Sequence, residues 1–394
     1  MNIMKYDFDS VIDRHNTCSM KYDSDIKLGS STTPMWVADM DFRSPPAVCE
    51  AVRKSAEFGI FGYCQPDDEY YNAVIDWYAK HFDWKIEKEW IVVTQGVVAA
   101  LAAAVEAFTE RGDKIMIQRP VYYPFTNVIE QNGRNVVNSS LILSDGIYRM
   151  DFDDIERKIR SEKVKMFFLC SPHNPVGRVW SICELKKIAE ICLRNNVILV
   201  SDEIHSDFVF EGRHFPMMNV DERVKNILVT CTAPSKTFNL AGLQTSNIII
   251  SNPSLRSKFK NVLNRTSHKL LNCMGITALK AAYLQSEPWL NELKIYLAEN
   301  IRIFKDYLEK NMPLLHLIAP QGTYLLWVDC RELGMTASEL DKFMKEKAKL
   351  WLDGGEMFGA EGEGFERFNI ACPRSVLLKA LEDLKSAYDE VAYD

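Results

Sequence analysis

The chain has 394 residues, 47% of them hydrophobic and 11% aromatic, and it carries 47 Lys and Arg against 54 Asp and Glu. A chain of this length and composition folds around a large core, which excludes a disordered or low-complexity protein. The net charge of −7 leaves no basic block that could neutralise phosphates, so we expect no nucleic-acid partner. Length alone predicts two to three domains.

Ten cysteines are scattered along the chain, without a CxxC pair or a zinc-type cluster with histidine, so we expect no metal site. The stretch Met1–Asp7 lacks the apolar run of a signal peptide. Scattered thiols in an unsecreted chain predict a cytoplasmic protein with reduced cysteines. A disulfide framework is the less favoured alternative.

The segment Ile91–Phe108 is apolar enough to suggest a membrane span, but Thr94-Gln95-Gly96 interrupts it and Glu106 lies near its end. We predict instead a buried strand, a tight turn and an Ala-rich helix, and no association with a membrane.

Between residues 90 and 250, short apolar or β-branched runs alternate with amphipathic stretches such as Ile182–Arg194. This alternation predicts a mostly parallel α/β sheet that is buried on both faces and binds ligands beyond the carboxyl ends of its strands. The expected strands are Trp90–Thr94, Lys114–Gln118, Arg134–Asn138, Val164–Cys170, Val197–Ser201, Asn226–Thr230 and Ser246–Ile250.

After Pro288 the pattern changes to that of a smaller α+β domain, with which the turn-rich first 45 residues are expected to pack. We predict a large domain over residues 46–287 and a small domain built from 1–45 plus 288–394. In the latter part we expect helices at Trp289–Asn311, at Ala337–Lys347 and after Pro373, and strands at Leu314–Ile318, Thr323–Asp329 and Arg367–Ala371.

Nucleotide motifs are missing from the sequence: no GxGxxG follows a strand and no GxxxxGK[ST] occurs. The glycines between residues 354 and 364 have the wrong spacing. The sequence therefore argues against a dinucleotide dehydrogenase or a P-loop enzyme.

Turns at two strand ends have residues that suit the binding of a ligand. Gly96 joins a strand to the Ala-rich helix, whose free N–H groups suit a phosphate, although taken alone a plain tight turn is the favoured interpretation. Asn174, in the turn Ser171–Gly177, would be held rigidly at the carboxyl edge of the sheet.

Two further strand ends carry charge. Asp202, Glu203 and His205 close an apolar strand, where a carboxylate needs a cationic partner unless Asp202 simply caps a helix. Lys236 stands among small and apolar residues, and desolvation makes such an amine a nucleophile and base. Phosphate cradle, rigid amide, carboxylate and amine together indicate one cofactor, pyridoxal 5′-phosphate (PLP).

The segments Pro34–Phe42, Phe61–Tyr63, Asp202–His205, Ser235–Asn239 and Arg367–Arg374 resemble motifs of fold-type I PLP enzymes of the class I/II aminotransferase superfamily. Within it they are most similar to the C–S lyase branch, the MalY/PatB-type cystathionine β-lyases and cystalysin. The resemblance implies the PLP-dependent transferase fold, with a large mostly parallel mixed-sheet α/β domain and a smaller α+β domain. It also implies a homodimer with shared active sites.

The resemblance assigns roles to single residues. Lys236 matches the Schiff-base lysine, Asp202 the partner of the pyridinium nitrogen and Tyr122 the aromatic ring that stacks on the cofactor, and these three are the expected catalytic residues. Arg367 matches the clamp of the substrate carboxylate. The other implied cofactor residues are Asn174, His205, Gly96, Val97, Val98, Ser235 and, from the other subunit, Tyr63; the other implied substrate residues are Trp36, Ala38 and Tyr123.

Two departures from the aminotransferase pattern favour elimination. His205 stands where many transaminases carry a tyrosine, and Gln244 stands where they often carry a phosphate-binding arginine. The resemblance thus implies α,β-elimination of L-cystathionine or a related cysteine S-conjugate to a thiol, pyruvate and ammonia. An aminotransferase of an L-amino acid, or a lyase with an added regulatory protein-binding role, are the alternatives.

Overall fold

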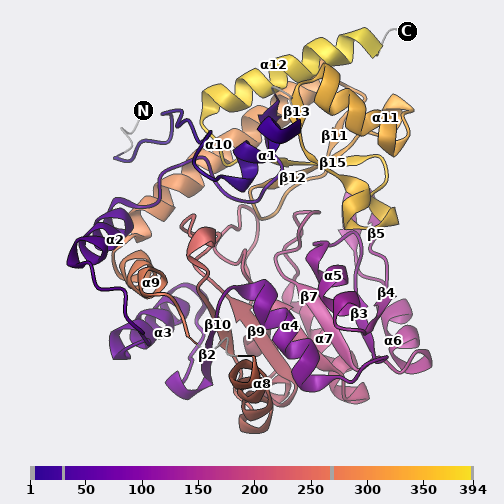
Figure 1. The fold of residues 1–394 in the computed structure, drawn as a ribbon. Coiled ribbons are helices and arrows are strands. Elements are labelled where there is room, and N and C mark those ends of the chain that lie inside the picture. The colour runs from indigo at the N-terminus through magenta and orange to yellow at the C-terminus, as the bar shows by residue number, and fades with distance from the viewer. Residues whose placement is uncertain (1–4, 29–31, 267–269, 392–394) are drawn as a thin grey trace.

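The computed structural model describes residues 5–28, 32–266 and 270–391. Its centre is a seven-stranded sheet of order β2-β10-β9-β8-β7-β3-β4, in which β10 runs antiparallel to both neighbours and the other strands are parallel to one another (Figure 1). All seven strands expected between residues 90 and 250 belong to this sheet. The prediction of a mostly parallel α/β sheet is confirmed.

The bounds of the elements are as follows. The helices are α1 (Met20–Leu28), α2 (Pro46–Phe58), α3 (Asp68–Phe82), α4 (Val97–Phe108), α5 (Pro124–Gln131), α6 (Phe152–Ser161), α7 (Ile182–Asn195), α8 (Pro253–Arg265), α9 (Cys273–Gln285), α10 (Glu287–Asn311), α11 (Ala337–Lys342) and α12 (Arg374–Val391). The strands are β1 (Thr33–Pro34), β2 (Ile91–Thr94), β3 (Lys114–Ile117), β4 (Asn135–Asn138), β5 (Ile142–Ser144), β6 (Ile147–Arg149), β7 (Met166–Cys170), β8 (Ile198–Asp202), β9 (Leu228–Thr232), β10 (Ser246–Ile249), β11 (His316–Leu317), β12 (Leu325–Asp329), β13 (Leu350–Trp351), β14 (Asp353–Gly354) and β15 (Phe365–Asn369).

Helices cover both faces of the large sheet because its strands are apolar on both sides. In β7, Met166 and Phe168 pack with α4, α5 and α8, whereas Phe167 and Leu169 pack with α6 and α7 on the other face. Successive side chains of a strand point to opposite faces, so a continuous apolar run is buried on both. The carboxyl ends of the strands are the edge left open for a ligand.

A second sheet, of order β11-β12-β15-β14 and antiparallel throughout, lies under α10 and α12 (Figure 1). The N-terminal region joins this part of the molecule, since β1 pairs in parallel with β13. It also contains α1, a helix that we did not expect in a turn-rich stretch. The division into domains at residues 46 and 288 remains a prediction.

Other differences are local. The hairpin of β5 and β6 was missed because three-residue strands are too short to show an alternating pattern. Strand β15 begins two residues earlier than expected, because Phe365 and the charged Glu366 pair with β12. The helix expected to Lys347 leaves the α-helical pattern at Phe343, where it widens into a π turn. No helix among the described residues is long and apolar enough to cross a membrane.

Candidate active site

The carboxyl ends of β2, β7, β8 and β9 meet at a cavity of about 360 Å³, large enough for a small-molecule ligand. The second wall of the cavity comes from residues 36–38 and from β14 and β15. It is therefore built from segments far apart in the sequence. The expected site residues that line it are Trp36, Ala38, Gly96, Val97, Val98, Tyr122, Tyr123, Asn174, Asp202, His205, Ser235, Lys236 and Arg367.

Lys236 follows β9 and lines this cavity, where its side chain is partly buried. Burial and the Arg367 guanidinium lower the pKa of its amine to about 8, against the opposing pull of Asp39 and Asp202. Its Nζ donates a hydrogen bond of 2.7 Å to the carbonyl of Ala38. An amine with this pKa is partly neutral near neutral pH, which is what a base or nucleophile requires.

Asp202 ends β8 and is also buried. Burial raises the pKa of its carboxyl to about 7, partly offset by the Ile204 N–H, which donates to Oδ1 at 3.2 Å, and by Lys236. His205, three residues on in a turn, has a pKa well below its ordinary value because it is buried and lies near the cationic Lys236 and Arg367. Its Nδ1 has no hydrogen-bond partner among the described residues. Both groups therefore lie ready for a ligand.

The turn before α4 suits an anion. Gly96 has a φ of 98°, a value that side-chain-bearing residues rarely adopt, and a Cβ built there would meet no atom within 4 Å. The first N–H groups of α4, at Val97 and Val98, have no acceptor within the helix. Helix N-termini of this kind bind phosphate groups.

Arg367 in β15 is almost completely buried and held on several sides. Its Nη1 donates to Asn174 Oδ1 at 3.0 Å and its Nη2 to the Trp36 carbonyl at 2.7 Å, and Nη2 also pairs with the Asp353 carboxylate. The guanidinium lies 4.9 Å from the centre of the Phe358 ring. Its Nε has no partner among the described residues and remains available to an acceptor.

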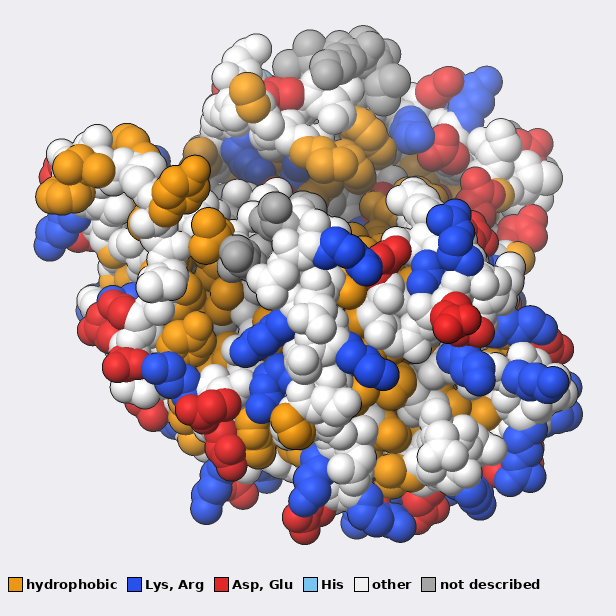
Figure 2. Space-filling view, turned by 60° about the horizontal axis from the view of Figure 1, so that its bottom comes forward, with side chains coloured by type: hydrophobic (Ala, Val, Ile, Leu, Met, Phe, Trp, Pro, Cys, Tyr) orange, Lys and Arg blue, Asp and Glu red, His pale blue; other side chains and the backbone are white. Residues whose placement is uncertain are grey.

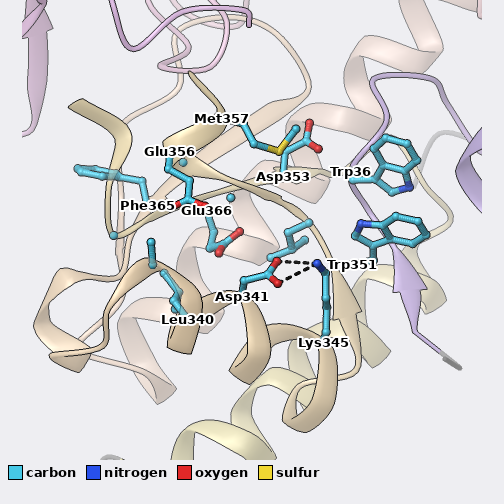
Figure 3. Close-up of a pocket in the computed structure, with 15 residues that line it drawn as sticks. Trp36, Leu340, Asp341, Lys345, Trp351, Asp353, Glu356, Met357, Phe365 and Glu366 are labelled. Atoms are coloured by element: carbon cyan, nitrogen blue, oxygen red, sulfur yellow. Dashed lines mark hydrogen bonds and ion pairs between the residues drawn. The ribbon is translucent and has the colours of Figure 1, made fainter. Parts of the chain in front are cut away.

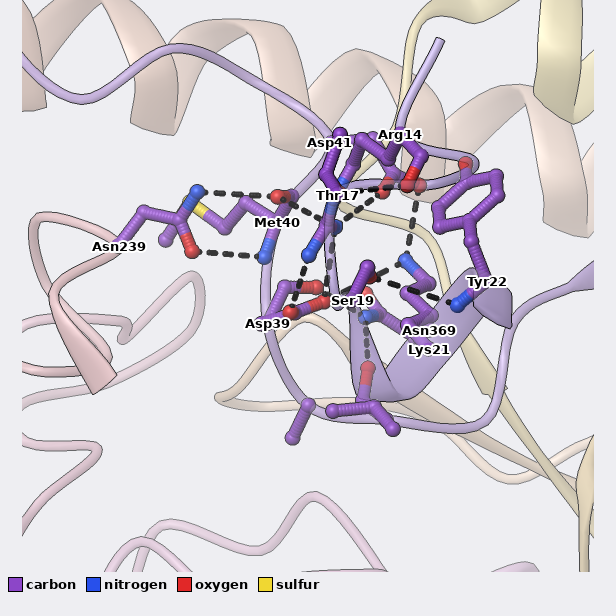
Figure 4. A network of polar contacts seen from close by, with 12 residues as sticks. Arg14, Thr17, Ser19, Lys21, Tyr22, Asp39, Met40, Asp41, Asn239 and Asn369 are labelled. Carbon is purple, nitrogen blue, oxygen red and sulfur yellow. Dashed lines mark hydrogen bonds and ion pairs between the residues drawn. The ribbon is translucent and has the colours of Figure 1, made fainter. Parts of the chain in front are cut away.

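The segment that carries Ala38 is fixed by a polar network (Figure 4). Asn369 Nδ2 donates to the carbonyls of Val37 and Asp39, both at 2.6 Å, while Asn239 exchanges hydrogen bonds with the backbone of Met40. The network thus ties β15 and the loop after Lys236 to the segment that accepts the Lys236 hydrogen bond.

Charged side chains extend the same network toward α1. Asp39 and Asp41 pair with Arg14, and the buried amine of Lys21 lies 2.8 Å from Asp41 Oδ2. These ion pairs connect the N-terminal segment to the wall of the cavity (Figure 4).

Tyr63 is the expected residue that does not line the cavity. Its side chain is 99% exposed, in an extended segment after α2. Its role at the site of another subunit remains a prediction.

Several residues of the site were not expected. Tyr324 donates its hydroxyl to the Ala38 carbonyl at 3.1 Å, Asp353 pairs with Arg367, and Cys170, Ile204 and Gln244 line the cavity. Asp353 could have been noticed as an acid just before the glycines of residues 354–364. No pattern in the sequence distinguishes Tyr324 or Cys170 from core residues.

The family model for aminotransferase class I and II matches residues 32–384. The chain is 43% identical over 383 residues to cystathionine beta-lyase PatB of Bacillus subtilis (strain 168), covering 96% of this chain and 99% of that protein. It is 33% identical over 387 residues to Protein MalY of Escherichia coli (strain K12), covering 97% and 98%.

The crystal structure of cystalysin from Treponema denticola, which contains a PLP cofactor, superposes with a TM-score of 0.95 at 39% identity, covering 98% of this chain and 100% of that one. An aspartate aminotransferase of Pyrococcus horikoshii is more distant, with 25% identity over 361 residues and 90% coverage of each chain. The fold is thus that of PLP-bound cystalysin, and the chain belongs to the aminotransferase class I and II family.

Proposed function

We propose that this protein is a PLP-dependent carbon–sulfur lyase of the cystathionine β-lyase type. It converts an L-cysteine S-conjugate, such as L-cystathionine, and water into a thiol, pyruvate and ammonia. The observation that carries the proposal is the Lys236 amine in one cavity with the Asp202 carboxylate and the Arg367 guanidinium. The names of PatB and cystalysin, and their identities to this chain, support the lyase reaction over transamination.

The residues of the cavity fit PLP. Among the described residues, the Asp202 carboxylate accepts only the Ile204 N–H, so it retains acceptor capacity for a protonated ring nitrogen. The open space at Gly96 and the free N–H groups of α4 provide for the phosphate. Asn174, whose Oδ1 already accepts from Arg367, has its amide N–H₂ group for the phenolic oxygen, and Tyr122 offers a partly buried ring in the cavity for stacking. Bound PLP supplies an electron-withdrawing ring that stabilises negative charge at the substrate Cα.

The chain's own residues perform the remaining steps. Arg367, which lines the cavity, binds the α-carboxylate of the substrate with the planar, multidentate geometry of guanidinium. Lys236, with a pKa of about 8, removes the proton from Cα once its amine is free. The electron pair left by the Cα proton forms a double bond to Cβ, and the electron pair of the Cβ–S bond leaves with the thiol. Water then replaces the amine to give pyruvate and ammonia.

The test is pyruvate release from cystathionine by the PLP-loaded protein without any added 2-oxo acid. Lys236→Ala should abolish release, whereas Lys258→Ala, on the exposed face of α8, should not change it. Pyruvate production that survives Lys236→Ala overturns the assignment of the lysine. A reaction that requires a 2-oxo acid identifies an aminotransferase instead.

A homodimer completes the proposal. Phe58, Ile60, Phe61 and Tyr63 are all largely exposed on the single chain, at and after the end of α2. Hydrophobic side chains gather on the projection at the left of the molecule, the side on which α2 lies (Figures 1 and 2). An exposed apolar stretch of this kind is typical of an interface between chains. Tyr63 would reach the phosphate of the partner's site from this segment.

Hybrid dimers test that role. Tyr63→Ala and Lys236→Ala chains, each inactive alone, are mixed under conditions of subunit exchange. If Tyr63 serves the partner's site, half of the dimers are hybrids with one intact site, and activity returns to about a quarter of the wild-type value. No recovery despite confirmed exchange, or a monomer in sedimentation analysis, contradicts the shared site.

In this assembly residues 46–287 form the cofactor domain and 1–45 plus 288–394 the small domain. The ten free cysteines fit the reducing cytoplasm.

A further inference from the structure

A second cavity, of about 210 Å³, lies at the edge of the four-stranded sheet (Figure 3). It is enclosed by α11, by β13 and β14, by β15 and by the turn Gly355–Phe358. It shares Trp36 and Asp353 with the candidate active site, but the other residues that line the two cavities differ.

Glu366 lines this cavity and has an unusual environment. It is only 2% exposed, yet among the described residues its carboxylate makes no hydrogen bond and no ion pair. Its neighbour Arg367 faces the active site, so Glu366 points to the opposite face of β15. Figure 3 shows its carboxylate directed toward Asp341. A buried carboxylate without a partner is costly, so its position indicates a site for a group that can pair with it.

The charges around Glu366 favour a cation. Asp341 is paired with Lys345 at 2.7 Å, and Asp353 is paired with Arg367. Glu356 lines the cavity from the short turn after β14. Lys345 is the one basic side chain in the lining, against four acids. The cavity as a whole is therefore negative.

The remaining wall is aromatic. Trp36 and Trp351 stack face to face with ring centres 4.9 Å apart, and Phe365 closes another side. Aromatic rings beside carboxylates are typical of sites for organic ammonium ions. Among the described residues no group of three or more acids, histidines or cysteines is arranged to hold a metal ion, which argues against a metal.

We propose that this cavity binds a small organic ammonium ion, with Glu366 as its carboxylate partner and the Trp36–Trp351 pair as its aromatic wall. The size of the cavity limits the ligand to a few non-hydrogen atoms. The cavity shares Trp36 and Asp353 with the candidate active site, but binding of the ion does not depend on the reaction proposed above. Asp353 lines this cavity and also pairs with Arg367, so a bound ion would lie beside the residue that holds the substrate clamp.

Binding is coupled to a proton. Burial and the carboxylates of Asp341 and Asp353 raise the pKa of Glu366 to about 8, against the opposing effect of Lys345, and Glu356 adds to the rise. Glu366 is therefore protonated in the empty cavity at neutral pH, and the ammonium ion displaces this proton. Between pH 6 and pH 8 the affinity should rise by up to about 50-fold, since the ionised fraction of Glu366 rises by that factor.

The test is isothermal titration calorimetry of the PLP-loaded protein with trimethylammonium chloride. A tertiary ammonium ion has no primary amine that could react with an aldehyde, and it stays charged over this pH range. We expect saturable binding at pH 8 that weakens toward pH 6, with proton release seen as a dependence of the heat on the buffer. tert-Butyl alcohol, of the same shape but uncharged, should not compete.

Variants complete the design. Glu366→Gln should weaken binding at pH 8 by about tenfold or more and remove its pH dependence. Glu363→Gln removes the same charge from an exposed position three residues earlier and should leave binding unchanged. Absence of saturable binding to the wild-type protein at pH 8, affinity that does not vary with pH, or equal binding by Glu366→Gln overturns the proposal. The first two outcomes need no variant, so they decide the matter even if Glu366→Gln folds poorly.

Discussion

Replacing Glu366 by glutamine keeps the shape of a buried side chain and removes its titration. The pKa of Glu366 is raised from 4.5 to about 8 in the folded protein, so the folded state holds a proton that the unfolded chain releases. The stabilisation is complete below about pH 4.5 and is lost as the pH rises through 8. Glutamine imitates the protonated form at every pH, so the variant should gain stability over the wild type as the pH rises.

The magnitude follows from the two pKa values. A difference of about 3.5 pH units, at about 1.36 kcal/mol per unit, corresponds to about 5 kcal/mol of unfolding free energy above pH 8. An unfolding entropy of about 2.1 cal/mol/K per residue gives about 0.8 kcal/mol per degree for 394 residues. The melting temperature of Glu366→Gln should therefore exceed that of the wild type by about 6 °C at pH 9, and by little at pH 5.

The assay is thermal unfolding of both PLP-loaded proteins from pH 5 to pH 9, in buffers free of amines so that the second cavity stays empty. Glu363→Gln is the matched control, because Glu363 is exposed and its removal should give no trend with pH. A difference between Glu366→Gln and the wild type that stays constant from pH 5 to pH 9 would refute the reasoning. It would mean that Glu366 is not buried as a protonated acid.

Three further substitutions test the active site. Asn369→Ala removes two hydrogen bonds of 2.6 Å to the carbonyls of Val37 and Asp39, and one that its Oδ1 accepts from the Ala371 N–H. A urea titration should show a loss of about 2–4 kcal/mol of unfolding free energy, and KM for cystathionine should rise. Gly96→Ala meets no atom within 4 Å but forces alanine to a φ of 98°, so PLP titration of the apoprotein should show weaker binding; unchanged affinity would remove the phosphate from this turn. Asp202→Asn should lower kcat by about a hundredfold, because the amide cannot hold a positive charge on the cofactor ring, and a kcat within a few-fold of wild type would contradict that role.

The sequence was sufficient for the large sheet because its strands are long apolar runs between turns. It was also sufficient for the cavity, since Asn174, Asp202 and Lys236 follow parallel strands and must share one edge of the sheet. It was not sufficient for the second wall. Tyr324 bonds to the Ala38 carbonyl and Asp353 pairs with Arg367, and such long-range tertiary contacts leave no local pattern.

Strand β15 shows why the second cavity could not be predicted. Alternation along a strand predicts that Glu366 and Arg367 face opposite sides, and a charged residue on each side usually means that one side is exposed. Here both sides are covered, so Arg367 meets Asn174 and Asp353 while Glu366 has no partner among the described residues. The position of Arg367 does not require an acid before it, because an apolar residue would preserve the strand at lower cost. Sequences depart from such local rules mainly at functional sites, so we expect a ligand, rather than an accident of packing, beside Glu366.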